Sequence, residues 1–161
     1  MAYMVHFGFA CITLVVQVIR GCPNGWETFD GSCYFVFSLR EDWITASHTC
    51  SLHHGYLAQA EDDYEDNFLK QIITKYHEGK RGDTHFWLGG DDMSKEGEWR
   101  WTANGQPFSY TNWYPGEPNN YHDQDCLLAH IRGTHFYWED WNCTSNFNFV
   151  CESGGHWIQF G

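Results

Sequence analysis

The sequence predicts a single α+β domain held together by disulfide bonds. The chain has 161 residues, a length that suits one domain. Two segments with helical signals precede a half that consists of strand and loop signals, which is typical of the α+β class. Six cysteines follow an apolar leader, and aromatic residues make up 19% of the chain, so a tightly packed core is available.

The leader comprises residues 1 to 21, MAYMVHFGFACITLVVQVIRG. The apolar run is short for a membrane span, and we interpret it as a secretory signal peptide. It has no Lys or Arg before the apolar run, and the cut expected after Gly21 is not an Ala-x-Ala site, so a retained anchor is the alternative. The later cysteines favour secretion, because disulfides form in oxidising compartments. We therefore expect an extracellular protein without a membrane span once the signal is removed.

The first elements expected after the leader are a hairpin and a helix. Trp26 to Phe29 and Cys33 to Phe37 are predicted to pair as strands around Asp30-Gly31. The next segment, Ser38 to Glu41, has the Ser-x-x-Glu form of a capping box and predicts a helix that ends at Gly55. Its apolar positions are Trp43, Ile44, Ala46, Cys50 and Leu52.

A second helix is expected after a short strand at Tyr56 to Ala58. Asp62 and Glu65 are predicted to cap this helix and Gly79 to end it. Four apolar residues recur at helical spacing, namely Phe68, Leu69, Ile72 and Ile73.

The second half of the chain begins with two predicted strands, His85 to Gly90 and Trp99 to Trp101. We place the folded domain at residues 22 to 152. Residues 153 to 161 are predicted to form a short C-terminal tail, in which we recognise no motif.

The chain is acidic, with a formal net charge of −12. This charge argues against nucleic-acid binding, which needs a basic surface. It suits a cation-binding protein or an acidic matrix component, although acidity also keeps a secreted domain soluble. An enzyme is not expected, because the chain has neither a Gly-x-Ser-x-Gly motif nor a phosphate-binding loop.

Residues Trp113 to Cys151 concentrate oxygen-bearing side chains in three short groups. These are Glu117-Pro118-Asn119, Gln124-Asp125-Cys126 and Trp138-Glu139-Asp140. Calcium takes about six to eight oxygen ligands, so carboxylates and amides gathered from separate turns predict a Ca²⁺ site. A cis bond at Pro118 would point the side chains on its two sides in the same direction.

Glu-Pro-Asn followed by Trp-x-Asp-x-x-Cys resembles the sugar-binding half of a C-type lectin domain. The segment Phe86-Trp87-Leu88-Gly89 is similar to the core segment of that family, and the opening Cys-Pro-x-Gly-Trp resembles perlucin-type molluscan lectins. The resemblance covers residues 22 to 151. It implies the C-type lectin fold, with two helices, two small antiparallel sheets and a long calcium-binding loop region.

The resemblance also implies how the cysteines pair, which their spacing alone leaves open. The implied bridges are Cys22 to Cys33, Cys50 to Cys151 and Cys126 to Cys143. These three bridges would leave Cys11, in the predicted signal, as the remaining cysteine.

The resemblance further implies a principal calcium site that also contacts the sugar, formed by Glu117, Asn119, Gln124, Glu139 and Asp140. Gln124 stands where the mannose-type pattern has Glu, and Glu139 stands where it has Asn. The number of carboxylates is therefore unchanged. Asp123 competes with Gln124 for its position. An auxiliary calcium site is implied at Asp92, Glu96, Asn120 and Asp125.

The expected function is that of a secreted, calcium-dependent lectin that recognises vicinal hydroxyls of mannose-type glycans. Such a lectin would act in innate immune recognition, for example of microbial surface polysaccharide. The exchange at Gln124 and Glu139 reverses donor and acceptor on one half of the site, so a galactose-type preference stays open. The alternative is an acidic shell-matrix protein that binds calcium carbonate. No heptad or collagen-like repeat is present, and we expect a monomer or a noncovalent dimer.

Overall fold

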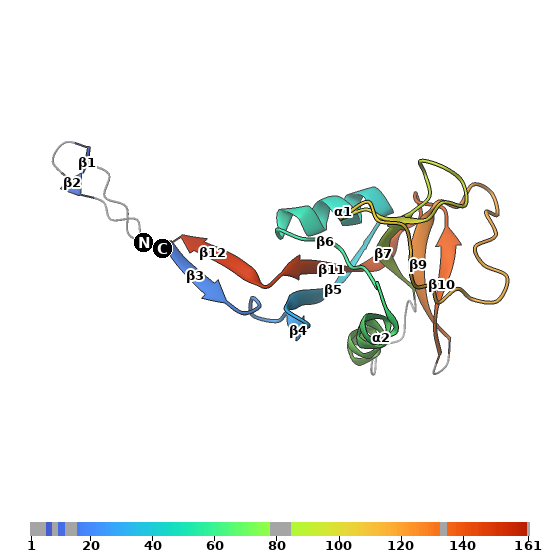
Figure 1. Ribbon diagram of the computed structural model, residues 1–161, viewed down its shortest axis with the longest axis horizontal. Coiled ribbons are helices and arrows are strands. Elements are labelled where there is room, and N and C mark those ends of the chain that lie inside the picture. Colours follow the sequence, from blue (N-terminus) through green and yellow to red (C-terminus); the bar gives the residue numbers. More distant parts are fainter. Residues whose placement is uncertain (1–5, 8–9, 12–15, 78–84, 133–134, 161) are drawn as a thin grey trace.

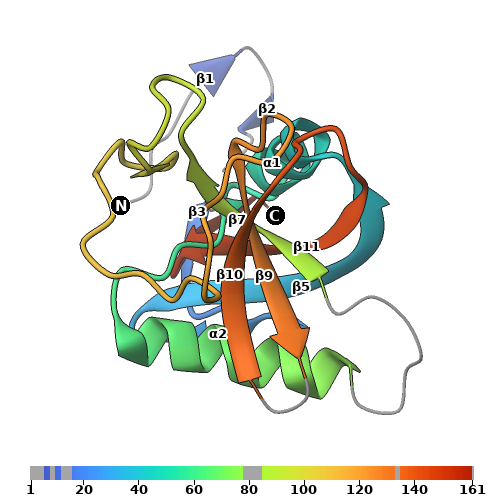
Figure 2. The same ribbon diagram turned by 90° about the vertical axis from the view of Figure 1, so that its right-hand side faces the viewer.

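The computed structural model describes residues 6–7, 10–11, 16–77, 85–132 and 135–160, with side chains described between residues 21 and 155 of those ranges. Helix α1 (Trp43–Leu52) and helix α2 (Asp63–His77) lie on opposite sides of a twisted sheet (Figures 1 and 2). The strands of this sheet are β4 (Glu27–Phe29), β5 (Ser32–Glu41), β6 (Tyr56–Leu57), β7 (His85–Asp91), β8 (Arg100–Trp101), β9 (Cys126–Arg132), β10 (His135–Trp141) and β11 (Phe147–Gly154).

The resemblance implies two small antiparallel sheets; in the structure they are two antiparallel parts of one sheet, joined by one parallel contact. Strands β4, β5, β6 and β11 form one part, and β7, β8, β9 and β10 form the other. The joining contact is the parallel pairing of β11 with β7, in which Phe149 lies opposite Trp87. The main strand order is β10-β9-β7-β11-β5-β4.

Alternation along the central strands divides the core between the two faces of this sheet. In β7, Phe86 and Leu88 belong to the cluster that includes Leu69 and Ile73 of α2. Trp87, between them, belongs to the cluster that contains Trp43 of α1. Successive side chains of a strand point to opposite faces, so a continuous apolar run can bury against both helices at once.

The start of α1 differs from the capping-box prediction, which is wrong. Ser38 and Glu41 belong to β5, where Glu41 pairs with Phe147, so this segment is used by the sheet. Asp42 is the N-cap instead, and its Oδ1 accepts a hydrogen bond of 2.9 Å from Thr45 N.

The end of α1 also differs in detail. His53 is the C-cap and His54 takes the positive φ of 58° that the turn requires. Gly55 follows, and it is needed for close packing, because a Cβ there would lie 2.1 Å from the carbonyl oxygen of Glu152.

The predicted cap of α2 is confirmed. Asp62 Oδ1 accepts from Glu65 N at 2.9 Å, and Glu65 Oε2 accepts from Glu61 N at 2.8 Å. Leu69 and Ile73 of its apolar face are fully buried. The predicted stop at Gly79 lies outside the described residues.

All three implied disulfides are present, with Cα to Cα distances of 5.3 to 5.4 Å. Cys50–Cys151 joins α1 to β11 across a sequence separation of 101 residues. Cys22–Cys33 fixes the first hairpin, and Cys126–Cys143 joins the start of β9 to the segment after β10.

Two short ribbons involve the ends of the chain. Strands β1 (His6–Phe7) and β2 (Ala10–Cys11) pair with each other, and β3 (Val16–Arg20) pairs with β12 (His156–Phe160). The β3–β12 ribbon extends away from the body (Figure 1). The signal peptide at residues 1 to 21 stays a prediction.

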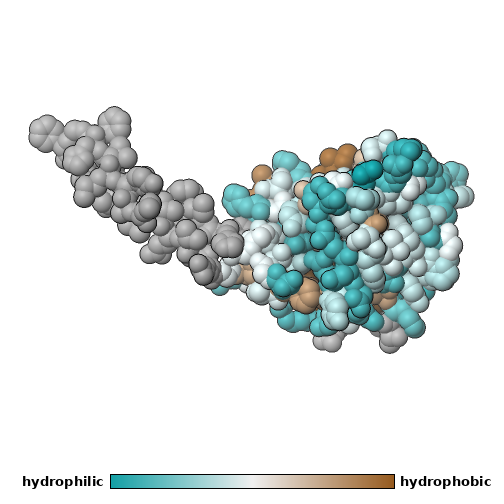
Figure 3. Space-filling model, in the orientation of Figure 1, coloured by the Kyte–Doolittle hydropathy of each residue, from teal (hydrophilic) through white to brown (hydrophobic). Residues whose placement is uncertain are grey.

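The face of the body in Figure 3 is mainly hydrophilic, with small separate hydrophobic areas. No helix within the described residues is long and apolar enough to cross a bilayer.

The cap of α1 can be tested with Asp42→Ala. This change removes the acceptor for Thr45 N, so we expect the free energy of unfolding to fall by about 1 kcal/mol in denaturant titrations. Ser38→Ala is the matched control, because Ser38 is an exposed strand residue, and it should change stability by less than about 0.5 kcal/mol. A larger loss of stability in Ser38→Ala than in Asp42→Ala would show that Ser38, and not Asp42, caps the helix.

Candidate functional site

The expected site residues gather at the end of the body away from the β3–β12 ribbon. The long connection between β8 and β9, coloured yellow to orange in Figure 1, runs over this end. Its backbone is tied to β10 at Trp138, whose N–H donates to Asn112 O and whose carbonyl accepts from Tyr114 N, both at 2.8 Å. The residues that follow, including Glu117, are thereby held beside Asp140.

The Glu117–Pro118 peptide bond is cis. Asn119 Nδ2 donates to Glu117 Oε2 at 2.7 Å, so the two side chains meet as the sequence predicts. Asp140, which is 2% exposed, accepts from Asn119 N at 3.0 Å and from Asn120 N at 2.6 Å. One buried carboxylate therefore shapes the whole turn.

Gln124 and Asp123 differ in how the loop places their side chains. Gln124 is buried and Asp123 is exposed, with a positive φ of 65°. The N–H of Gln124 donates to Asn120 Oδ1 at 3.0 Å, which fixes this part of the loop on the Asn120 turn. Gln124 is therefore the residue turned inward.

A second acidic group adjoins the first. Carboxylate oxygens of Asp92, Glu96 and Asp125 lie within 4.8 Å of one another. Asn120 Nδ2 donates to Glu96 Oε2 at 2.6 Å, so all four expected auxiliary residues come together. Asp92 is 1% exposed, and its Oδ2 accepts from Gly97 N at 2.8 Å. Its Oδ1 is buried and has no hydrogen-bond partner among the described residues.

Burial and the proximity of other carboxylates raise the pKa of one carboxyl group in each of the two acidic groups. Burial, followed by the adjacent Asp140, raises the pKa of Glu117 to about 7. Burial, followed by the Glu96, Asp125 and Asp140 carboxylates, raises the pKa of Asp92 to about 6. A bound divalent cation would lower these pKa values, because it favours the ionised carboxylates. The two groups offer carboxylate and amide oxygens, and one of these, Asp92 Oδ1, is buried without a hydrogen-bond partner among the described residues. Such a set of oxygen atoms fits the requirements of Ca²⁺.

Glu139 makes a contact that the sequence does not reveal. Its side chain is 11% exposed, and Oε1 lies 2.8 Å from His130 Nδ1. It is also close enough to raise the pKa of Glu117. Glu139 thus stands between the turn of Glu117 and a histidine of β9.

Asp66 of α2 is a further residue that sequence reasoning missed. It is 4% exposed, and its carboxylate accepts from Trp138 Nε1 and from Asn112 Nδ2, each at 2.8 Å. Tyr110 OH lies 3.4 Å from Oδ2. No sequence motif distinguishes Asp66 from Asp63, an exposed acid in the first turn of the same helix.

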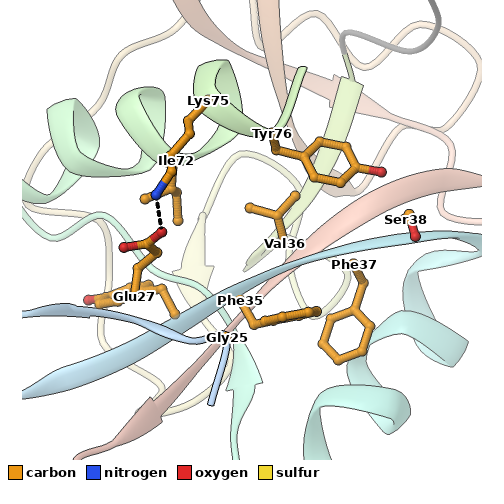
Figure 4. A pocket seen from close by; sticks show the side chains of 10 residues that line it. Gly25, Glu27, Phe35, Val36, Phe37, Ser38, Ile72, Lys75 and Tyr76 are labelled. Atoms are coloured by element: carbon orange, nitrogen blue, oxygen red, sulfur yellow. Dashed lines mark hydrogen bonds and ion pairs between the residues drawn. The ribbon is translucent and has the colours of Figure 1, made fainter. Parts of the chain in front are cut away.

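Two hollows adjoin the described surface. One of about 530 Å³ lies beside Pro118, and its walls include Trp99, Arg100, Phe108 and Trp113. The other, of about 460 Å³, lies between β5 and α2 (Figure 4). In the latter, Phe35 and Tyr76 are among the lining residues, and Lys75 Nζ lies 2.5 Å from Glu27 Oε1. None of the expected site residues lines this second hollow.

Comparison with known proteins gives matches over most of the chain. Residues 40–153 match the family model described as Lectin C-type domain. A perlucin-like protein of Mytilus galloprovincialis is 33% identical over 132 residues, covering 81% of this chain and 81% of that protein. Perlucin of Haliotis laevigata is 30% identical over 133 residues, covering 82% and 83%.

A solved structure of the cow CD23 C-type carbohydrate-recognition domain, in the presence of GlcNAc2Man3 oligosaccharide, superposes with a TM-score of 0.72. It is 30% identical, and the match covers 84% of this chain and 98% of that chain. These matches confirm the fold that the sequence predicts.

The buried Asp66 predicts how stability changes with pH. Burial raises its pKa to about 6, whereas hydrogen bonds from Trp138 and Asn112 act in the opposite direction. The folded state holds this proton more tightly than the unfolded state, so the free energy of unfolding should fall as pH rises from about 4 to about 6, by roughly 3 kcal/mol. Asp66→Asn removes this dependence.

The measurement is the difference in unfolding free energy between wild type and Asp66→Asn across this pH range, in EDTA. Asp63→Asn is the control, because Asp63 is exposed at the start of the same helix, and its curve should run parallel to that of wild type. If the curve of Asp66→Asn also ran parallel to that of wild type, Asp66 would not be the group responsible for the pH dependence.

Proposed function

Because the chain belongs to the C-type lectin family, which comprises carbohydrate-binding proteins rather than enzymes, we propose that it is a secreted lectin that binds glycans through calcium. The observation that carries the proposal is the carboxylate of Asp140. It is almost completely buried, yet it shapes the Glu117–Asn120 turn and lies against Glu117. Without a cation, a buried carboxylate is unfavourable beside a second, partly exposed one.

The proposed calcium ligands are Glu117, Asn119, Gln124, Glu139 and Asp140. Calcium would supply open coordination positions for two neighbouring sugar hydroxyls. The same side chains would hold the sugar by hydrogen bonds, since a carboxylate accepts and an amide nitrogen donates. Asp92, Glu96, Asn120 and Asp125 are proposed to bind an auxiliary calcium, and the unpartnered Asp92 Oδ1 supports that assignment.

We propose mannose-type glycans as ligands, with microbial surface polysaccharide as a natural source. Glu117 and Asn119 keep the order of acceptor and donor associated with that preference. The CD23 domain, 30% identical to this chain, was solved in the presence of a mannose-containing oligosaccharide. The aromatic walls of the hollow beside Pro118 would contact further sugar units of an oligosaccharide.

The acidity of the chain, −12, also suits the alternative of an acidic shell-matrix protein that binds calcium carbonate. Elution separates the two functions. A lectin leaves immobilised mannose in EDTA or in free sugar, whereas a mineral-binding protein stays on carbonate crystals whatever sugar is added.

The calcium site is tested with Asp140→Asn. The amide removes one charge while keeping the size of the side chain, so calorimetry should show Ca²⁺ affinity reduced at least about tenfold, because one charged ligand contact is worth roughly 1.5 to 3 kcal/mol. Retention on immobilised mannose should be lost. The control is Asp123→Asn in the same loop, since Asp123 is exposed, and it should retain both activities. Equal losses in the two variants would contradict the ligand set.

Sugar preference is tested with the double change Gln124→Glu and Glu139→Asn, read on a glycan array with calcium. It restores the mannose-type order on the second half of the site, so calcium binding should survive. The ratio of mannose to galactose signal should rise several-fold, because a charged hydrogen bond is worth roughly 1.5 to 3 kcal/mol. An unchanged ratio would assign the choice of sugar to neighbouring side chains such as Tyr121 and His122.

A further inference from the structure

Three adjacent strands each contribute one potential metal ligand to a single point. His85 of β7 lies directly opposite His130 of β9 in the antiparallel register. On the next strand, β10, Tyr137 pairs with His130 and Glu139 pairs with Leu128. Glu139 is therefore the diagonal neighbour of His130, at two positions along the strand, and it shares a face with the two histidines.

The side chains converge on this face. Ligand atoms of His85, His130 and Glu139 all lie within 4.8 Å of one another. The imidazole centroids of His85 and His130 are 4.0 Å apart, with 24° between the ring planes, and His130 Nδ1 is 2.8 Å from Glu139 Oε1. The side chains of His130 and Glu139 are 12% and 11% exposed.

Aromatic rings shield the cluster. The ring centroid of Phe147 lies 5.3 Å from that of His85, and that of Trp141 lies 6.3 Å from it. A partly enclosed carboxylate beside two imidazoles is a strong ligand set, because water competes less well for an ion there.

We propose that His85, His130 and Glu139 bind one Zn²⁺ ion next to the proposed calcium site, with Glu139 shared between the two sites. Imidazole nitrogen suits zinc, whereas calcium selects oxygen, so the two ions would partition between neighbouring sites. Zinc ligand atoms at about 2.0 to 2.2 Å from the ion lie roughly 3.5 Å from one another. The three ligand atoms, all within 4.8 Å of one another, are near this spacing, and rotation of the side chains would bring them to it.

The proposal gives Glu139 two contacts. Oε1 faces His130, which leaves the second carboxylate oxygen for the turn of Glu117. Three protein ligands also leave a fourth coordination position open for water or another small ligand. Asn, the mannose-type residue at this position, would offer the histidines an amide in place of a carboxylate, so the zinc site depends on the exchange to Glu139.

The test uses the full disulfide-bonded chain in saturating CaCl₂, titrated with ZnCl₂ by calorimetry. Co²⁺ serves as a second probe, because its visible absorption reports nitrogen ligation in a site of low coordination number. We expect one Zn²⁺ per chain, with affinity lowered at least tenfold in His85→Asn and in His130→Asn. The control is His135→Asn: His135 is exposed on β10, its ring stacks on Tyr137, and its replacement should leave the affinity unchanged.

Several outcomes overturn the proposal. These are no zinc binding by wild type, wild-type affinity in both His85→Asn and His130→Asn, loss of binding in His135→Asn, or displacement of Zn²⁺ by excess calcium. Thermal unfolding of each variant in EDTA separates lost ligands from lost folding, since a folded variant that fails to bind zinc supports the assignment. Glycan binding in calcium is recorded for the same samples. Because the histidine variants leave the five proposed calcium ligands unchanged, failure of the zinc site is distinguished from failure of the lectin function.

Discussion

The binding end of the molecule depends on the buried contact between Asp66 and Trp138. Asp66 belongs to helix α2, and Trp138 lies two residues before Asp140 on β10, so this contact connects the scaffold to the proposed calcium ligands. Asn112 extends the connection, because its amide donates both to Asp66 and to the carbonyl of Phe136. A buried carboxylate costs free energy unless hydrogen-bond donors surround it. Here the donors are the side chains of Trp138 and Asn112, so satisfying Asp66 also fixes β10 and the long loop in place.

This contact explains how a long loop without helix or strand can present a defined set of ligands. Trp138 pairs with Trp113 as an isolated parallel bridge, and its ring packs edge-on against those of Trp101, Tyr110 and Trp113. The loop is thus held by its aromatic side chains against the core. From there the chain reaches Glu117 within four residues, and the carboxylate of Asp140 completes the turn.

Sequence reasoning succeeded where the signal was local. Glu117 and Asn119 flank one proline, and Asp62 caps a helix three residues before Glu65, so adjacency in the chain implies adjacency in space. It failed at Ser38, because a Ser-x-x-Glu pattern is compatible with a cap and with a strand, and the pairing of β5 with β11 decides the outcome. It also missed His85 and His130, which come together only through the register of β7 against β9. Their contact depends on how two strands pair, and the spacing of the two residues in the sequence does not indicate that pairing.

The disulfide between Cys50 and Cys151 has a consequence for survival outside the cell. Every proposed calcium ligand and both histidines of the proposed zinc site lie between these two cysteines in the chain. A protease that cuts once in the exposed loop at Asn119–Asp123 would therefore leave two fragments that remain covalently attached. The fragments would separate only on reduction, and β11 would stay beside α1 after the cut. A nicked molecule would thus keep its two fragments together, with the proposed ligands of both fragments in one molecule. Without this bridge, no disulfide would connect the two fragments.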